Sequence, residues 1–321
     1  VVYGDRGFCI VNTEAVGLAY ARRKYGDMRV AVVDTDCHHG DGTEDIYWND
    51  PDTLYISFHQ DGRTLYPGTG PIEDLGGPSA FGYNVNIPLP PGTGDEGFQY
   101  VLENTVLPIL EEYKPDLIIN SAGQDNHYTD PLTNMSFSAQ GYAKLNSRLN
   151  PDIAVLEGGY SIQGALPYVN TGIILAMAEL DYSGVAEPDY HLGRWKQSER
   201  ITGEVKRISD EVLDIWRRRE ALGQKLFGGK SSVKRNRRVY YDTDGIFESQ
   251  VQEFRPCPDC PGVDSIKSRN DLGASLIGFT IPRKACPACQ KAGYDLFEKA
   301  KGLDVKKRFL QDLVRDEFFA V

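Results

Sequence analysis

The feature that most constrains this chain is the alternation of short apolar runs with helical patterns in its first half. The apolar runs, rich in valine and isoleucine, lie at 28–34, 53–58, 83–87, 116–120 and 152–156. Segments with helical apolar spacing lie around them, at 12–25, 95–113, 137–149 and 161–180. Buried parallel strands read as continuous apolar runs, so the pattern predicts an α/β fold: a doubly wound, mostly parallel sheet with helices on both faces. Such sheets bind ligands beyond the carboxyl ends of their strands.

Beyond these helices the pattern changes to one long amphipathic helix. Apolar side chains recur every three or four residues from Ile201 to Leu226, which predicts a helix at about 197–227. We expect this helix to pack on its own domain; the alternative is a coiled coil that makes a homo-oligomer. The glycines and serines that follow predict a flexible linker, so we expect an α/β domain at 1–228 and a second unit at 229–321.

The composition disfavours some classes of function. A formal net charge of −11 disfavours a broad nucleic-acid surface, because phosphate binding depends on a positive field. A basic run at 230–238 is the local exception, and we interpret it as a solvated linker. We find no apolar stretch long enough to span a membrane and no secretory leader, and therefore expect a cytoplasmic protein without membrane association.

Four of the six cysteines form two C-x-x-C pairs, Cys257 with Cys260 and Cys286 with Cys289. Each pair can supply two thiolates from a tight turn, and tetrahedral zinc takes four, so the spacing predicts a structural zinc in a small zinc ribbon. Reversible disulfide chemistry of the C-x-x-C pairs is the alternative. Residues 294–321 show the apolar spacing of a further amphipathic helix.

Three polar clusters follow predicted strands. In the first, at 34–43, Asp36 and His38 are two residues apart on a strand end, so both side chains point the same way and one zinc ion can take both. Taken alone, this segment is equally well explained by a hydrogen-bonded turn. The second cluster contains Asp130 before a proline. The third ends at Tyr160, after two glycines that let a ligand approach the backbone closely.

Together these clusters resemble the histone deacetylase superfamily, which includes acetylpolyamine amidohydrolases and bacterial class II-like deacetylases. Six segments match that family in order: Gly7-Phe8-Cys9, the 34–43 motif, Ser57-Phe58-His59, Tyr66-Pro67-Gly68-Thr69-Gly70, Asp125 with Asp130-Pro131, and Glu157-Gly158-Gly159-Tyr160. The resemblance covers residues 7 to about 180 and implies an arginase/deacetylase-like sheet. It does not extend to the four-cysteine unit.

The resemblance implies a mononuclear zinc site and a substrate tunnel. It makes Asp36, His38 and Asp130 the ligands of a catalytic zinc. It also makes Tyr160 a catalytic residue, whose hydroxyl stabilises the oxyanion that forms on the substrate. The implied substrate-binding residues are Phe8, Tyr66, Phe137 and Gly159.

Other positions match supporting features of the family. The implied inner site for a monovalent cation, K⁺, comprises Asp34, Asp36, His38, Ser57 and Phe58. Asp34 and Asp41 match carboxylates that orient two adjacent histidines, one of which is the family's general base. Those two histidines precede the Gly-Phe-Cys segment in the family and are absent from this sequence. We therefore expect the chain to be the C-terminal part of a longer product and to be inactive alone.

The sequence thus predicts a zinc-dependent amidohydrolase, a deacetylase acting on an acetylated protein lysine, an acetylpolyamine or another small acetylated amine. A non-catalytic module that binds acyl-lysine or a partner protein is the alternative. The expected cofactors are a catalytic Zn²⁺, a structural Zn²⁺ in the ribbon, and K⁺.

Overall fold

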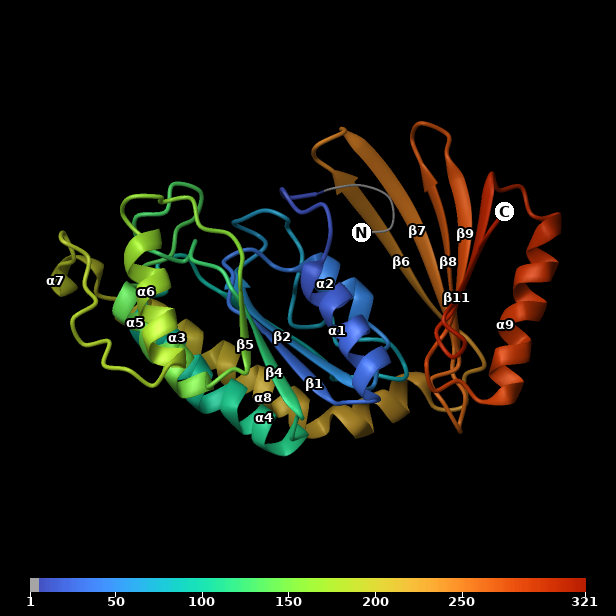
Figure 1. Ribbon diagram of the computed structural model, residues 1–321, viewed down its shortest axis with the longest axis horizontal. Coiled ribbons are helices and arrows are strands. Elements are labelled where there is room, and N and C mark those ends of the chain that lie inside the picture. The colour runs from blue at the N-terminus through green and yellow to red at the C-terminus, as the bar shows by residue number, and fades with distance from the viewer. Residues whose placement is uncertain (1–5) are drawn as a thin grey trace.

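The computed structural model describes residues 6–321, apart from the side chains of Leu192 and Arg194, and it contains two separate sheets (Figure 1). All five strands of the first sheet are parallel and follow the order β3-β2-β1-β4-β5. Their bounds are β1 (Val30–Asp34), β2 (Thr53–Gln60), β3 (Asn84–Leu89), β4 (Leu117–Ala122) and β5 (Ile153–Leu156). The predicted parallel α/β sheet is confirmed, since each expected strand is present. Asp34 pairs with Ser57 and with Ser121, so the polar clusters begin at one edge of the sheet.

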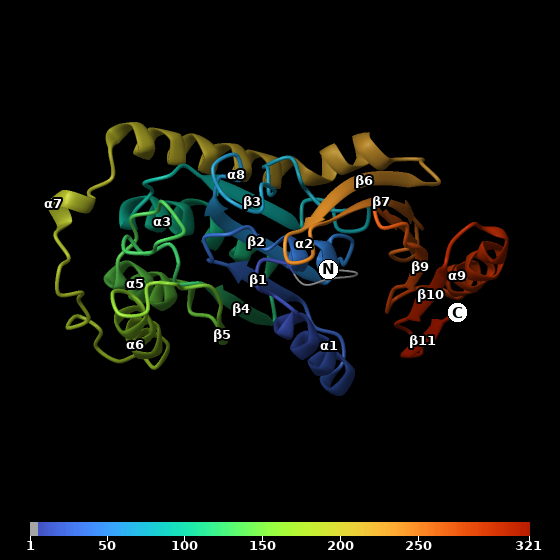
Figure 2. The ribbon, with the colours of Figure 1, turned by 90° about the horizontal axis from the view of Figure 1, so that it is seen from above.

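Helices cover both faces of this sheet, as Figure 2 shows for α1 and α8 on opposite sides. On one face, Leu18 and Tyr47 pack against Val30 and Val32. The other face carries the larger core, in which Phe58, Phe98 and other side chains are buried. The helices of this domain are α1 (Thr13–Tyr25), α2 (Asp41–Tyr47), α3 (Asp95–Val101), α4 (Leu107–Tyr113), α5 (Ala139–Leu149), α6 (Leu166–Met177), α7 (Leu192–Trp195) and α8 (Glu199–Phe227). A short π-helical segment, Leu102–Val106, joins α3 to α4.

The long helix α8 packs along its own domain. It contacts α3 and β3, and the Trp216 indole N–H donates to Glu112 Oε2 at 2.7 Å. Its buried side chains include Ile201, Val205, Ile208, Val212 and Trp216. A homo-oligomer through this helix is not supported, because the apolar face that a coiled coil needs is already covered. Within residues 6–321, no helix combines the length and the apolar character that a membrane crossing requires.

The second sheet has six strands in the order β11-β10-β9-β8-β7-β6 and is antiparallel except between β9 and β10. Its elements are β6 (Val233–Tyr241), β7 (Ile246–Arg255), β8 (Val263–Asn270), β9 (Ser275–Ile281), α9 (Pro287–Lys299), β10 (Lys307–Asp312) and β11 (Glu317–Ala320). The helix predicted for 294–321 is wrong beyond Lys299. A 3₁₀ turn that includes Gly302, a poor helix former, ends it, and the remaining residues pair as strands β10 and β11.

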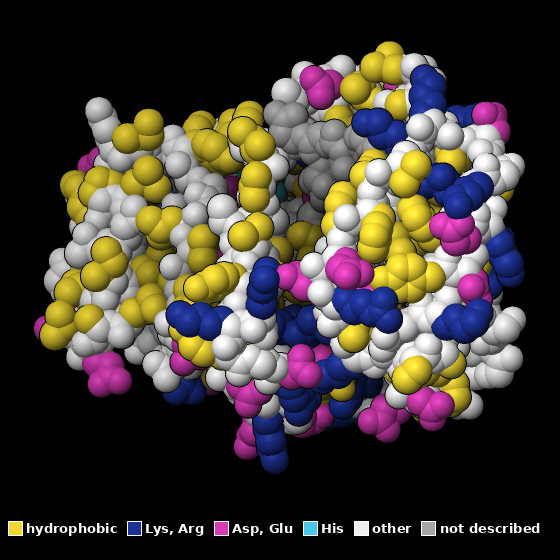
Figure 3. All heavy atoms as spheres, turned by 45° about the vertical axis from the view of Figure 1, so that its right-hand side comes forward, with side chains coloured by type: hydrophobic (Ala, Val, Ile, Leu, Met, Phe, Trp, Pro, Cys, Tyr) yellow, Lys and Arg dark blue, Asp and Glu magenta, His cyan; other side chains and the backbone are white. Residues whose placement is uncertain are grey.

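The prediction of a solvated linker for the basic run at 230–238 is also wrong, because most of this run forms strand β6. The side chains of Arg235 and Arg237 point toward α2 and pair there with Glu44 and Asp45. These ion pairs with α2 explain why the charged run forms a strand that packs on the first domain and is not a solvated linker. On the side of the molecule where the second sheet comes forward, lysines and arginines are intermixed with acidic side chains (Figure 3).

Candidate metal and substrate site

The polar clusters that follow β1 and β4 meet beyond the carboxyl ends of these strands. Ligand atoms of Asp36, His38 and Asp125 all lie within 4.8 Å of one another. The Nδ1 atom of His38 is 2.7 Å from Asp125 Oδ2 and 3.3 Å from Asp36 Oδ1. Asp36 and His38 are predicted zinc ligands, whereas Asp125, which follows β4, was not predicted to be a ligand.

The loop after β5 closes over this cluster. The Gly158 N–H donates to Asp36 Oδ2 at 3.0 Å, and the Tyr160 N–H donates to Asp130 Oδ2 at 2.9 Å. A Cβ at position 158 would lie 2.7 Å from Asp125 Oδ2, so only glycine allows this approach without displacing the carboxylate. Gly158, one of the two glycines before Tyr160, therefore lets the backbone approach the cluster closely.

Asp130 lies beside the cluster but is not one of its three members. Its Oδ1 accepts from the Leu132 N–H at 2.9 Å, while its Oδ2 bonds Tyr160 as described. Its role as a zinc ligand stays a prediction. The hydrogen bond from the Tyr160 N–H nevertheless holds Asp130, the predicted zinc ligand, next to Tyr160, the predicted oxyanion donor.

The electrostatics of the cluster favour a bound cation. Burial would lower the pKa of His38, but hydrogen bonds and charge from Asp125 and Asp36 raise it to about 10. Burial and the charge of Asp36 raise the pKa of both Asp125 and Asp34. The negative charge of Asp36 thus disfavours the charged forms of Asp125 and Asp34, and a divalent cation would relieve this repulsion.

The donor set fits zinc. Imidazole nitrogen and carboxylate oxygen are ligands that zinc accepts, and three protein ligands leave a position open for substrate. Asp36, His38 and Asp125 come from two loops that the parallel sheet holds in place, so little rearrangement is needed for them to enclose one ion. Asp36 and His38 are therefore well placed to hold a metal, with Asp125 adjacent to both.

The predicted substrate-binding residues separate into two groups. Phe8 is 79% exposed, with its ring centroid 6.0 Å from that of Tyr160, and Tyr66 is 40% exposed, 6.4 Å from the His38 ring. Each of these aromatic side chains thus lies next to a residue of the candidate site. Phe137 instead is fully buried in the core, where its ring stacks on that of Phe98 with centroids 4.3 Å apart, and its role in the channel wall stays a prediction. Gly159 follows Gly158 and packs against Gln124.

The predicted supporting residues lie beneath the cluster. Asp34 is buried and its Oδ2 accepts from the Tyr55 hydroxyl at 2.7 Å. Ser57 pairs with Asp34 in the sheet, and its hydroxyl contacts His59 Nδ1 at 2.9 Å, while Phe58 is buried next to it. Asp41 pairs with Arg6. The K⁺ site at these residues stays a prediction.

A second metal group is formed by the four cysteines of the C-terminal sheet. Their sulfur atoms lie within 4.8 Å of one another, and Cys257 Sγ is 4.0 Å from Cys286 Sγ. That separation is too long for a disulfide, whereas tetrahedral zinc with bonds of ~2.3 Å places its sulfurs about 3.8 Å apart. A backbone hydrogen bond involving Cys289 helps to lower the pKa of Cys286 to about 7, which favours a thiolate. The cluster is compatible with the predicted zinc ribbon, embedded in a larger sheet.

Replacing both Cys257 and Cys286 with serine is expected to remove one equivalent of zinc, because two of four thiolates are lost. Metal analysis of the purified variant measures this. The matched control is Cys9→Ser, since Cys9 is exposed and far from the other cysteines in sequence. Unchanged zinc content in the double variant would rule out the four-cysteine site.

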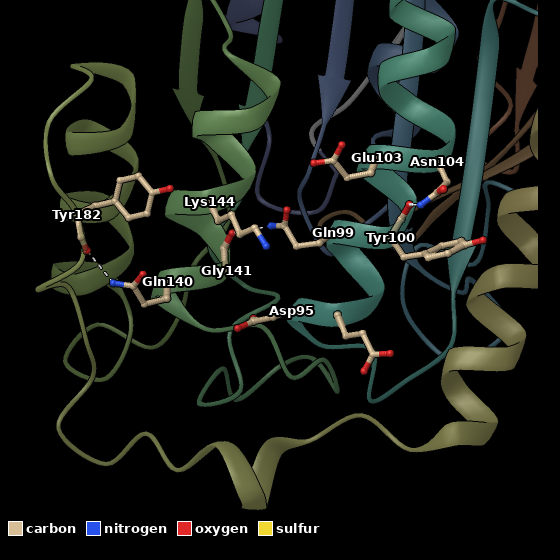
Figure 4. Close-up of a pocket in the computed structure, with 10 residues that line it drawn as sticks. Asp95, Gln99, Tyr100, Glu103, Asn104, Gln140, Gly141, Lys144 and Tyr182 are labelled. Carbon is tan, nitrogen blue, oxygen red and sulfur yellow. Dashed lines mark hydrogen bonds between the residues drawn. The ribbon is translucent and has the colours of Figure 1, made fainter.

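A groove of about 550 Å³ lies elsewhere, between α3 and α5 (Figure 4). Its polar lining includes Asp95, Gln99 and Lys144. Asp95 is already engaged by Ser138, whose backbone N–H and hydroxyl both donate to it. The groove shares no residue with the metal cluster, and we assign it no role.

Comparisons with known proteins point to one family. The profile of the histone deacetylase domain matches residues 4–174. A protein named "Probable deacetylase" from Archaeoglobus fulgidus is 44% identical over 224 residues, covering 66% of this chain and 62% of that protein. The chain spans less than two thirds of the length of the curated relatives it matches first.

Solved structures agree with this match. The crystal structure of the HDA15 HD domain has a TM-score of 0.57 and 29% identity, covering 70% of this chain and 61% of that one. An acetylpolyamine aminohydrolase from Burkholderia pseudomallei has a TM-score of 0.50 and 33% identity, covering 54% of this chain and 51% of that one. Both are similar to this chain over the parallel sheet that carries the candidate site.

Proposed function

The chain belongs to the histone deacetylase family, and from this premise we propose that the protein hydrolyses an acetyl-amide on a protein lysine, an acetylpolyamine or another small acetylated amine. The observation that carries the proposal is the convergence of Asp36, His38 and Tyr160 with two exposed aromatic side chains at one edge of the sheet. Such an arrangement supplies ligands, an oxyanion donor and an apolar entrance in one place.

In this proposal Asp36, His38 and Asp130 hold a catalytic zinc, and Asp125 orients His38 through its 2.7 Å contact. Bound there, zinc would supply a Lewis acid that polarises the amide carbonyl and makes water more acidic. Phe8 and Tyr66 would enclose the aliphatic stem of the substrate. Tyr160 would donate its hydroxyl hydrogen to the substrate oxygen as negative charge develops there.

The remaining proposals concern the supporting ions and the second unit. We propose K⁺ near Asp34, Ser57 and Phe58, and structural zinc at the four cysteines. We also propose that the chain divides functionally at residue 228, with the α/β domain binding substrate. The six-stranded unit then supports that domain through the contacts of β6.

We expect the chain from Val1 to Val321 to show no measurable deacetylase activity, because no histidine is free to act as general base. Three of the five are buried and engaged: His39 with Thr69, His59 with Ser57, and His127 with Glu187. His38 is a proposed ligand, and His191 precedes α7, at the end of the molecule away from the second sheet (Figure 1). General-base catalysis typically contributes ~10²–10⁴-fold.

The assay is hydrolysis of a fluorogenic acetyl-lysine peptide by this chain beside the product of the complete gene. Turnover by the complete product alone supports the proposal. Comparable turnover by the chain means that another group takes the proton. Binding of acetyl-lysine peptide without turnover in either protein would favour the non-catalytic module instead.

A further inference from the structure

The turn between β6 and β7 reaches the mouth of the proposed substrate channel. Asp242 is the first residue of this turn. Its Oδ1 accepts hydrogen bonds from the Gly7 backbone N–H and from the Tyr66 hydroxyl, each at 3.2 Å. Gly7 directly precedes Phe8. A single carboxylate oxygen in this turn therefore bonds both Tyr66 and the segment that carries Phe8.

The hydroxyl of Tyr66 is held from two directions. It accepts from Arg6 Nε at 3.2 Å and donates to Asp242. Arg6 is itself fixed by its ion pair with Asp41, and its guanidinium lies 5.6 Å from the Tyr66 ring centroid. Because Arg6 donates to this hydroxyl and Asp242 accepts from it, the two hydrogen bonds together fix the orientation of the Tyr66 ring.

The segment that carries Phe8 is a tight turn that needs external support. The backbones of Arg6 and Cys9 bond each other in both directions, and Gly7 and Phe8 between them have φ of 56° and 66°. Positive φ is unfavourable for a bulky residue such as phenylalanine and persists only where the surroundings hold it. The bond from Gly7 to Asp242 is one such restraint.

Strand β6 is anchored firmly enough to serve as that support. The guanidinium of Arg235 lies 3.3 Å from the Trp48 ring centroid and 3.1 Å from Glu44 Oε1, and Arg237 pairs with Asp45. Both carboxylates belong to α2, whose first residues are the last three of the 34–43 motif. Glu44 is almost fully buried, and its Oε2 also lies 3.2 Å from His39 Nε2.

We propose that Asp242 is a positioning residue for the substrate channel: it holds Phe8 and Tyr66 at the spacing that an acyl-amide stem requires. The C-terminal sheet is thereby part of the substrate site, although it contributes no metal ligand there. This inference rests on the proposed function and extends it to a residue outside the deacetylase domain match.

The test compares Asp242→Ala, Asp242→Asn and Asp244→Ala in the complete protein, with the fluorogenic acetyl-lysine peptide as substrate. Alanine removes both hydrogen bonds and is expected to raise KM about tenfold, with kcat within about twofold of the original. Asparagine keeps an acceptor oxygen and should restore most of the affinity. Asp244 is the matched control, because it lies in the same turn, its side chain is exposed, and no hydrogen bond or ion pair joins it to another of the described residues, 6–321.

A second measurement does not depend on activity. In the chain from Val1 to Val321, hydrogen exchange of the peptide containing Gly7 should become faster in Asp242→Ala and stay unchanged in Asp244→Ala. Unchanged KM and unchanged exchange in Asp242→Ala would overturn the proposal. Equal losses in the alanine and asparagine variants, with a lowered Tm, would show that Asp242 only supports folding. An inactive original protein with faster exchange in Asp242→Ala would instead count against the proposed function alone.

Discussion

Asp36→Asn is expected to remove the catalytic zinc and to lower turnover by at least roughly 10³-fold. A metal acting as Lewis acid contributes several kcal/mol of transition-state stabilisation, and each 1.36 kcal/mol is about tenfold in rate. Asparagine is a weaker ligand than a carboxylate. Its single side-chain oxygen also cannot replace both carboxylate oxygens, which accept from the backbone N–H groups of Gly158 and His38. Metal analysis should show one zinc lost while the four-cysteine zinc remains.

The pair Asp125→Asn and Asp130→Asn decides which carboxylate completes the ligand set. Asp125 accepts from the Cys37 N–H at 2.8 Å and contacts His38, as an orienting carboxylate does. We therefore expect Asp125→Asn to weaken zinc affinity about 10–100-fold, and Asp130→Asn to abolish zinc binding at this site and activity with it. Complete loss in Asp125→Asn with an active Asp130→Asn variant would exchange the two roles.

Much of the α/β domain could be predicted because its signals are local. The apolar runs at 53–58 and 152–156 are strands because buried parallel strands need apolar side chains on both faces. The convergence of Asp36 and His38 with the loop before Tyr160 followed from parallel topology, which gathers strand ends at one edge. The roles of these residues came from the family motifs.

The second unit was harder to predict because long-range pairing determines it. Lys307–Asp312 pairs with β9, some thirty residues earlier, and this pairing overrides the helical spacing that the sequence shows after residue 294. The basic run likewise gave no sign that Arg235 would stack on Trp48. Asp242 carries no local signal at all, since its partners Gly7 and Tyr66 are distant in sequence. Contacts of this kind appear only once the two sheets are placed together.

Tyr160→Phe is expected to lower kcat by about 10²-fold or more while zinc content and Tm stay unchanged. The hydroxyl donates to an oxygen that becomes negative only as the reaction proceeds, so its loss raises the barrier without weakening ground-state binding. The fold does not depend on it: the loop is held by the backbone N–H of Tyr160, which bonds Asp130 Oδ2 and survives in phenylalanine. The aromatic ring that faces Phe8 is also retained.

Steady-state kinetics on the complete protein measure this effect, and Tyr128→Phe is the matched control. Tyr128 lies between Asp125 and Asp130 in the chain, but its ring packs against those of His127 and Trp195, so removing its hydroxyl should leave kcat within about twofold. Burial, together with the charges of Asp125 and Asp36, raises the pKa of Tyr160, so the phenol stays protonated at neutral pH and is available as a donor. A change confined to KM in Tyr160→Phe would show instead that the hydroxyl only binds substrate.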